Sequence, residues 1–265
     1  MRTVNPSSFE ASVASGYMYK AMNKILELAL LTLSLLLVNG DDELPNHYTT
    51  NPSIVPIKSC CDLRIYPPAR VPSGVYKMSM GTFGSANVYC DMTTADGGWT
   101  VIQRNRKNGA VSFIKNWREY EDGFGDLGTE FWYGLKAMHS LTQSSQWEMR
   151  VDFKKEGGIV SYIHYNQFKV ASAIEKYKLT VKGYISGDGD YFTTGNEPPN
   201  CTMFTTLDND NDLWNDDNCA IYWKSGWWFH SCHDINPNIQ PPRYNYPHIA
   251  THIEIKIRQK DCIIE

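Results

Sequence analysis

The feature that most constrains this 265-residue chain is a long segment, residues 187–247, without apolar periodicity. Asp, Asn, Pro and Trp dominate this segment, and it shows neither the alternation of a strand nor the stripe of a helix. An irregular segment of this length is unusual inside a compact domain, because ordering it costs conformational entropy that regular structure does not offset. The sequence therefore predicts that disulfide bonds or a metal ion hold this segment in one conformation.

Outside this segment, short alternating stretches predict an antiparallel sheet. Four stretches alternate apolar and polar side chains: residues 147–153, 159–165, 177–185 and 252–258. In the last of them, Ile253, Ile255 and Ile257 share one face, and the charged side chains between them share the other. Such half-buried alternation favours an antiparallel sheet over a doubly wound parallel one. Residues 129–141 carry apolar side chains at helical spacing and predict one packed helix.

The N-terminal region contains a short apolar segment, residues 25–38, in which Glu27 is the only charge. A membrane span needs about 20 apolar residues, whereas the core of a secretory signal has about 7–15. We therefore interpret residues 1–40 as a signal peptide, with a type II signal anchor as the alternative. Residues 41–59 are polar and contain prolines, as a linker does, and residues 60–265 form the globular domain. The protein is expected to be secreted and extracellular, or membrane-anchored in the alternative.

All seven cysteines follow the apolar segment, as expected for an oxidising compartment. Their odd number leaves at least one thiol unpaired or linking two chains, which leaves a homo-oligomer open. A formal charge of −4 gives no general attraction to nucleic acid, so no nucleic-acid partner is expected. Asn200, in Asn200-Cys201-Thr202, fits the N-glycosylation sequon; an unused sequon is the alternative.

The segment 207–218 reads LDNDNDLWNDDN and contains five aspartates. Clustered carboxylates repel each other unless a cation lies between them, and Ca²⁺ prefers about 6–8 oxygen ligands. The alternate spacing of Asp210 and Asp212 lets two carboxylates converge on one ion. A solvated acidic turn is the alternative. An EF-hand is excluded because Leu213 occupies the position that needs Gly. A D-x-D glycosyltransferase is disfavoured because the chain lacks βα alternation.

Eight ordered motifs carry a family resemblance. They lie at residues 97–104 (GGWTVIQR), 116–120, 123–125, 130–132, 204–212 (FTTLDNDND), 218–220 (NCA), 226–228 (GWW) and 231–233 (SCH). With these motifs, the chain from Cys60 to Arg258 resembles a fibrinogen C-terminal (fibrinogen-related) domain, which ficolins, tachylectins and angiopoietins share. The resemblance implies an α+β fold with a disulfide-closed N-terminal part, a central antiparallel β-sheet, few short helices and a loop-rich subdomain that binds calcium and ligand.

The resemblance also implies disulfide bonds and a metal site. It pairs Cys61 with Cys90 and Cys219 with Cys232, and it leaves Cys60, Cys201 and Cys262 without assigned partners. It further implies a structural Ca²⁺ whose ligands are the carboxylates of two aspartates and the backbone carbonyls of two later residues: Asp210, Asp212, Trp214 and Asp216.

A ligand site beside the calcium loop is implied as well. In tachylectins and ficolins, an acetyl group enters a small aromatic funnel at the second disulfide. The peptide bond between Ser231 and Cys232 corresponds to one that is cis in several members. The matching positions here are Tyr222, Trp223, Ser231, Cys232 and His233. Core packing is the alternative role for Trp223. After Asp234 this chain departs from the family pattern, and Tyr244 and Tyr246 are the candidates to complete the funnel.

The sequence favours a binding protein over an enzyme. It contains none of the common hydrolase, zinc-protease or phosphate-binding motifs, and a disulfide-bonded Cys232 supplies no thiolate. The leading hypothesis is a secreted, calcium-stabilised lectin that binds acetylated glycans or glycoproteins in innate immune recognition. The alternative is a signalling or extracellular-matrix ligand, angiopoietin-like, that binds a protein receptor.

Overall fold

The computed structural model describes residues 57–64, 71–79 and 84–262. All of them belong to one compact unit, Val55–Glu265. The predicted signal segment and most of the predicted linker lie outside the described residues. Within the described ranges, no helix combines the length and the apolar character needed to cross a bilayer.

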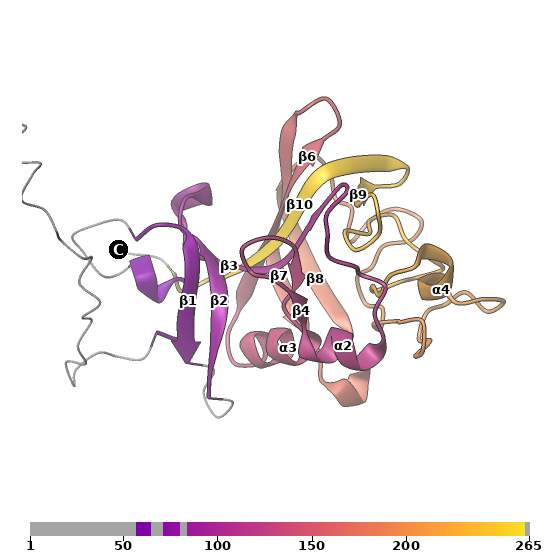
Figure 1. Ribbon diagram of the computed structural model, residues 1–265, viewed down its shortest axis with the longest axis horizontal. Helices are drawn as coiled ribbons and strands as arrows, with labels where there is room; N and C mark the ends of the chain where they lie inside the picture. Colours follow the sequence, from indigo (N-terminus) through magenta and orange to yellow (C-terminus); the bar gives the residue numbers. More distant parts are fainter. Residues whose placement is uncertain (1–56, 65–70, 80–83, 263–265) are drawn as a thin grey trace, which may run out of the picture. The chain divides into compact units, whose positions relative to one another are not determined.

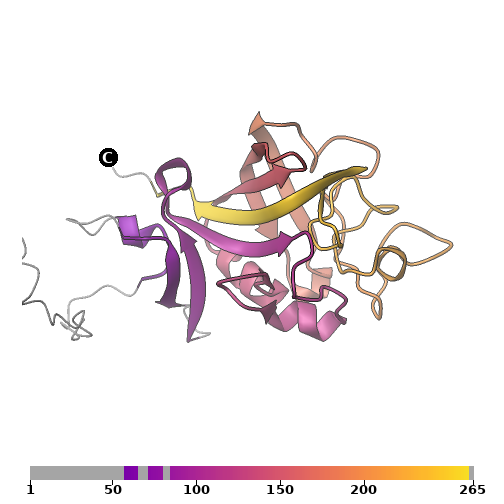
Figure 2. The same cartoon turned by 45° about the horizontal axis from the view of Figure 1, so that its top comes forward.

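A ten-stranded antiparallel sheet forms the centre of this unit, which confirms the predicted fold class. Its main path has the order β1-β2-β3-β10-β6-β7-β8. Three short strands pair beside this path, β4 and β5 next to β3 and β9 next to β10. The strand bounds are β1 (Gly74–Ser79), β2 (Ser85–Asp91), β3 (Trp99–Arg106), β4 (Phe124–Gly125), β5 (Phe131–Trp132), β6 (Trp147–Lys155), β7 (Val160–Val170), β8 (Leu179–Gly187), β9 (Arg243–Asn245) and β10 (His248–Gln259). Figure 2 shows β3 and β10 side by side along the sheet.

Strand β10 has the alternating burial that the sequence predicts, and its second face contains one buried charge, that of Lys256. Ile253, Ile255 and Ile257 lie in the main apolar core, as expected. On the other face, the ammonium group of Lys256 is only 3% exposed and contacts three carboxylates, those of Asp91 (2.7 Å), Asp152 (2.8 Å) and Glu254 (3.1 Å). A buried charge is tolerated when it is paired and hydrogen-bonded. The alternation therefore identifies the strand but not its second, ionic interface.

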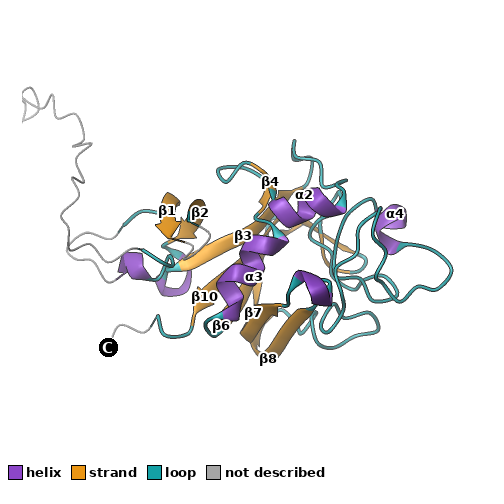
Figure 3. Ribbon diagram, turned by 90° about the horizontal axis from the view of Figure 1, so that it is seen from below, coloured by secondary structure: helices purple, strands orange, loops and turns teal. Residues whose placement is uncertain are grey.

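Within the described residues, three α-helices and three short 3-10 helices accompany the sheet. Their bounds are α2 (Trp117–Asp122), α3 (Leu135–Gln143), α4 (Cys219–Trp223), η1 (Asp62–Arg64), η3 (Thr94–Asp96) and η4 (Ala173–Glu175). Figure 3 shows α2 and α3 across one face of the sheet, whereas Figure 1 shows α4 among the loops at the end away from β1 and β2.

The helix predicted at residues 129–141 begins later than expected. Gly134 has a φ of 100°, a conformation that glycine adopts readily, and it separates β5 from α3. Phe131 and Trp132 therefore pair with β3 and β4 in the sheet. The helical spacing of their side chains was coincidental, because tertiary pairing overrides a short local pattern.

The disulfide bonds correct one predicted pairing. Cys60, not Cys61, pairs with Cys90, and Cys61 pairs with Cys262. Cys60 is fully buried in a small apolar cluster that also contains Cys90. Cys61 instead lies against the C-terminal segment, where Arg64 Nη1 donates to the carbonyl oxygen of Cys262 (2.8 Å). Cys201 is free and exposed.

The segment from 188 to 242 has little regular structure, as the sequence predicts. Its only α-helix is α4, and the disulfide bond between Cys219 and Cys232 closes a loop with that helix inside it. Trp227 and Trp228 are fully buried beneath it, so they are packing residues. Trp227 also exchanges two backbone hydrogen bonds with Thr205 (2.9 and 3.1 Å). Aromatic packing and the disulfide thus replace a sheet as the constraint on this segment.

Candidate functional site

The acidic loop brings two of the predicted metal-ligating carboxylates together. The backbone N–H of Asp212 donates to Asp210 Oδ1 (3.2 Å), and Asp212 Oδ1 accepts from the N–H of Trp214 (2.9 Å). Partial burial, together with the negative charge of Asp210, raises the pKa of the Asp212 carboxyl, although its backbone hydrogen bonds lower it. The two carboxylates therefore repel each other. Among the described residues, no cationic side chain forms an ion pair with either of them.

This arrangement fits a hard cation if backbone carbonyls complete the ligand set. No group of three or more His, Cys, Asp or Glu side chains in the described part of the chain is placed to hold a metal. Two carboxylates alone do not fill a Ca²⁺ coordination sphere. The carbonyl of Asp216 accepts no backbone hydrogen bond from any described residue, and the carbonyl of Trp214 begins a turn over residues 215–216. Asp216 is exposed and Trp214 is half-buried.

A different acid connects the loop to the rest of the domain. Asp208 Oδ1 accepts from the N–H of Trp117 (2.8 Å), at the start of α2, and from the hydroxyl of Thr206 (2.7 Å). Asp208 thus makes structural contacts through Oδ1.

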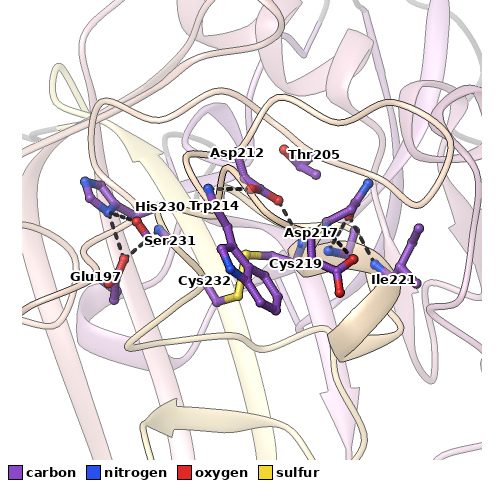
Figure 4. Close-up of a disulfide and its surroundings, with 12 residues drawn as sticks. Glu197, Thr205, Asp212, Trp214, Asp217, Cys219, Ile221, His230, Ser231 and Cys232 are labelled. Atoms are coloured by element: carbon purple, nitrogen blue, oxygen red, sulfur yellow. Dashed lines mark hydrogen bonds and ion pairs between the residues drawn. A yellow bond between two sulfur atoms is a disulfide. The ribbon is translucent and has the colours of Figure 1, made fainter.

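The second disulfide is coupled directly to the acidic loop (Figure 4). The N–H of Cys219 donates to Asp212 Oδ2 (2.9 Å). The side-chain oxygen of Asn218 caps α4 by accepting from the N–H groups of Ala220 (2.7 Å) and Ile221 (3.1 Å). The loop, the helix cap and the Cys219–Cys232 bond therefore form one connected unit.

The backbone at Ser231 differs from the expectation. The resemblance implies a cis peptide bond between Ser231 and Cys232, but the cis bonds of the described residues are both at prolines, Pro241 and Pro247. The N–H of Ser231 donates to Glu197 Oε2 (2.6 Å), and that carboxylate also contacts His230 Nδ1 (2.8 Å). This hydrogen bond occupies the N–H of Ser231. Figure 4 shows Glu197, His230 and Ser231 together.

The remaining predicted ligand residues form a connected aromatic cluster. The ring of Trp223 lies 4.5 Å from that of His233 and 5.2 Å from that of Tyr222, measured between centroids. Tyr222 in turn contacts Trp214 of the acidic loop (5.7 Å). Tyr246 lies 6.0 Å from Trp223 and 6.1 Å from His233. The structure therefore places the aromatic cluster beside the acidic loop, with Trp214 as the link.

His233 is the most deeply buried polar member of the cluster. Its side chain is nearly inaccessible, and neither ring nitrogen has a hydrogen-bond partner among the described residues. Burial and the positive charge of Arg243 lower the pKa of His233 to about 3, so the imidazole is neutral at physiological pH. A neutral imidazole offers one donor and one acceptor.

Buried amide side chains hold the C-terminal part of the site. Asn105 Nδ2 of β3 donates to the carbonyl of Pro237 (2.7 Å), and Gln103 Nε2 donates to Asn238 Oδ1 (3.1 Å). Asn236 exchanges two backbone hydrogen bonds with Arg243 (3.1 and 3.0 Å). The segment after Asp234, where the sequence departs from the family pattern, is therefore a loop that buried hydrogen bonds hold in place.

Nothing in the sequence indicates that Arg243 belongs to the cluster, and of the two tyrosines proposed to complete it only one does so. Tyr246 joins the cluster, whereas Tyr244 is buried elsewhere and stacks on Phe153 (4.4 Å). The guanidinium of Arg243 lies 5.8 Å from the ring of Trp223 and 5.0 Å from that of Tyr246. A lone arginine among Pro, Asn and Tyr gives no signal of such a position in the sequence.

A surface cavity of about 350 Å³ adjoins this region of the chain. Its walls include Asp234 and Asn245, the chain neighbours of His233 and Tyr246. A larger cavity of about 460 Å³ lies elsewhere, between the end of α3 and β7. No residue of the aromatic cluster is among the residues that line the smaller cavity.

Asn200 contributes to the fold through its side chain. Its Oδ1 accepts from the N–H of Val181 in β8 (2.8 Å), and the residue is half-buried. Glycosylation attaches to the other atom, Nδ2, so occupancy of this sequon stays a prediction.

Comparisons with known proteins agree with this architecture. The family described as the fibrinogen beta and gamma chains, C-terminal globular domain, matches residues 58–253. Human fibroleukin is 38% identical over 183 residues, which cover 68% of this chain and 41% of fibroleukin. Ryncolin-4 of Cerberus rynchops is 38% identical over 167 residues, which cover 63% of this chain and 47% of ryncolin-4. The chain thus matches less than half the length of these relatives.

A solved structure shows the same fold. The fibrinogen-like globe domain of human ANGPTL6 superposes with a TM-score of 0.70 and is 30% identical in sequence. The superposition covers 78% of this chain and 96% of the globe domain.

Proposed function

The chain belongs to the family of fibrinogen C-terminal globular domains, and on that premise we propose that it is an extracellular, non-enzymatic recognition protein that binds acetylated glycans. The proposed role is innate immune pattern recognition, with calcium as a structural ion. The binding site is the aromatic cluster of Trp223, His233 and Tyr246.

One observation carries this proposal: aromatic walls surround ring N–H groups that have no partner in the protein. Trp223 Nε1 and both ring nitrogens of His233 are buried and unpaired among the described residues. A buried unpaired donor costs about 1–3 kcal/mol, and such groups persist in proteins where function uses them. An acetyl group has a methyl for the aromatic faces and a carbonyl oxygen for one N–H, so it matches both requirements.

Calcium is proposed at the acidic loop. The facing carboxylates of Asp210 and Asp212, together with the carbonyls of Trp214 and Asp216, are the groups that would hold it. Bound there, the ion would neutralise two carboxylates and fix the loop that contacts Tyr222 through Trp214. Its contribution would be to the shape of the site, and the aromatic residues themselves would contact the glycan.

Extracellular location and absence of catalysis have separate support. The described cysteines form three disulfide bonds, which persist in oxidising compartments. Cys232 is one of these bonded cysteines and therefore offers no nucleophilic thiolate beside His233.

Binding to N-acetylglucosamine, compared with glucosamine and glucose, tests the acetyl-binding function. Calorimetry with and without calcium should give binding to the acetylated sugar alone. The variant Tyr246→Ala should weaken that binding, because it removes one wall of the cluster. Tyr184→Ala is the matched control, since Tyr184 is a partly exposed tyrosine in β8 outside the cluster. Equal binding of glucose and N-acetylglucosamine would refute the proposal.

A receptor-binding function is the second candidate, and exposed apolar side chains favour it. Leu213, Ile221 and Tyr222 are each more than half exposed and all lie on the acidic loop or α4. Apolar side chains gathered at one end of a domain are typical of a protein-binding surface. Binding to cells that survives enzymatic removal of surface glycans, and is lost in Ile221→Asp, would favour this function.

A further inference from the structure

The cavity of about 460 Å³ between the end of α3 and β7, called here the α3–β7 cavity, has walls that hydrogen bonds hold in place. Helix α3 lies against the sheet (Figure 3), and Val170 of β7 donates its N–H to Thr142 Oγ1 in the last turn of the helix (3.1 Å). The N–H of Lys260, just after β10, donates to the carbonyl of Gln146, just before β6 (3.0 Å). The volume lies within the range of about 300–1,000 Å³ that is typical of ligand sites.

The charged side chains that line the α3–β7 cavity are all positive. Lys169 of β7 and Lys260 line it, and no Asp or Glu does. The lysines that form ion pairs in the described ranges are others: Lys107, Lys115, Lys136, Lys155 and Lys256. The chain as a whole carries a formal charge of −4, so this local excess of positive charge is not a general property of its surface. Two ammonium groups without a carboxylate partner attract an anion.

A buried indole in the same cavity lacks a hydrogen-bond partner. Trp147, at the start of β6, lines the cavity and is only 2% exposed. Its Nε1 has no acceptor among the residues that the structure describes. Leaving a buried donor unpaired is unfavourable, and a bound molecule is one way to satisfy it. Because an indole N–H and an ammonium group can only donate, all three groups require acceptor atoms, and the two lysines favour acceptors that are negatively charged.

The rest of the wall carries amide and hydroxyl groups. Five side chains that line the cavity make no hydrogen bond with any described residue: Gln143, Ser144, Gln146, Asn166 and Gln167. Amide groups both donate and accept, and the last turn of a helix leaves carbonyl oxygens without intrahelical partners. The two aromatic side chains of the wall, Trp147 and Phe168, are buried and offer no apolar platform. The wall therefore fits a ligand that is rich in hydroxyl groups and carries an anionic group.

From these observations we propose that the α3–β7 cavity binds a sulfated oligosaccharide. A sulfate ester accepts hydrogen bonds from the ammonium groups of Lys169 and Lys260 and from the indole N–H of Trp147. The sugar hydroxyls contact the amide side chains. The site is separate from the proposed acetyl-binding site, because none of the residues that line it belongs to the aromatic cluster.

Sucrose octasulfate, sucrose and inorganic sulfate are the probes, because none of them contains an acetyl group. Calorimetry on the secreted full chain should give binding of sucrose octasulfate and none of sucrose. Inorganic sulfate, which offers the anion without the sugar, should bind at least about tenfold more weakly than the octasulfate. Inorganic sulfate that binds as tightly as the octasulfate would refute the assignment to a sugar.

Replacement of both lysines by glutamine tests their role. The double variant Lys169→Gln with Lys260→Gln should bind sucrose octasulfate about 10- to 100-fold more weakly, the range expected when charge-assisted hydrogen bonds are lost. Lys154→Gln with Lys178→Gln is the matched control, because these two lysines are exposed, do not line the cavity, and remove the same charge. Melting temperatures establish that each variant is folded. An equal loss of binding in both double variants would show attraction by overall charge and would refute the site.

The indole N–H of Trp147 gives a readout that general charge attraction does not move. The variant Trp147→Phe identifies the Nε1–H signal of this residue in the nitrogen-15 NMR spectrum of the wild-type protein. That signal should shift when sucrose octasulfate saturates the wild type and should stay unchanged with sucrose. A bound octasulfate that leaves the Trp147 signal in place would place the ligand elsewhere and overturn the proposal.

A last comparison separates this site from the acetyl-binding site. Tyr246→Ala, which should weaken binding of N-acetylglucosamine, should leave binding of sucrose octasulfate unchanged. The double lysine variant should do the reverse. Loss of octasulfate binding in Tyr246→Ala, or no binding of the octasulfate to the wild type, would refute the α3–β7 site and leave the acetyl-binding proposal to its own test.

Discussion

Replacement of Lys256 by methionine tests the ionic interface of β10 most directly. The Lys256 ammonium lies within 3.1 Å of carboxylates of Asp91, Asp152 and Glu254, and it is almost inaccessible to solvent. Methionine keeps the length of the side chain but leaves three carboxylates without their common cation. Removal of one partner from a buried ion pair destabilises a protein by about 3–5 kcal/mol.

The expected effect can be stated as a melting temperature and compared with a control. For a domain of this size each kcal/mol shifts the melting temperature by about 2–4 °C, so we expect a decrease of about 6–20 °C. Lys107→Met is the control, because the ion pair between Lys107 and Glu156 is exposed and contributes at most about 1 kcal/mol.

The dependence on pH gives a second readout with a definite sign. Burial raises the pKa of the Asp91 and Glu254 carboxyls, but their hydrogen bonds and the charge of Lys256 outweigh it and hold both below their usual values. Carboxyls with a lowered folded-state pKa stabilise the fold above their unfolded pKa, about 4, and lose that contribution as the pH falls further. The wild-type protein should therefore lose stability below about pH 4.

In Lys256→Met, the same carboxyls are buried without their cation, so their protonation relieves strain. The difference between wild type and variant, measured by denaturant unfolding, should be largest from pH 5 to pH 8 and should decrease as the pH falls below about 4. A loss of stability no greater than in Lys107→Met, or a difference that is constant with pH, would refute this account.

Three further predictions concern the metal and the cysteines. The melting temperature should be higher with calcium than with chelator, by the equivalent of about 2.7 kcal/mol at a hundredfold excess of calcium over its Kd. The variant Asp212→Asn should abolish that rise. Identical melting temperatures of the wild type with calcium and with chelator would exclude the ion. Replacement of both Cys61 and Cys262 by serine should destabilise the fold by about 5 kcal/mol in the chain-entropy model, and replacement of Cys219 and Cys232 by about 3 kcal/mol. The difference arises because the first bond closes a loop of 201 residues and the second a loop of 13. Denaturant unfolding measures both losses, and a larger loss for the Cys219–Cys232 pair would contradict the assignment. Native protein should react with one equivalent of iodoacetamide per chain, at Cys201; peptide mapping that finds Cys61 or Cys262 labelled would contradict the pairing.

The sequence by itself determined the fold class and the location of the candidate metal site. The alternation of apolar and polar side chains that predicts the antiparallel sheet is a local property, because the side chains of each strand indicate by themselves which face is buried. The spacing of Asp210 and Asp212 is equally local, because two residues in one short loop converge without help from distant chain. The pairing of Cys219 with Cys232, implied by the family resemblance, was confirmed for a similar reason, because these two cysteines are close in sequence.

Only the tertiary structure decided the partners that are far apart in sequence. Cys61 is bonded across 201 residues to Cys262, and Lys256 contacts Asp91 from a strand at the opposite end of the domain sequence. Arg243 reaches Trp223 because buried amides of β3 and Asn236 fix the loop that carries it. Such contacts depend on how the sheet orders its strands and where the irregular loops settle against it. No periodicity within a short window indicates that order, so these contacts became apparent only in three dimensions.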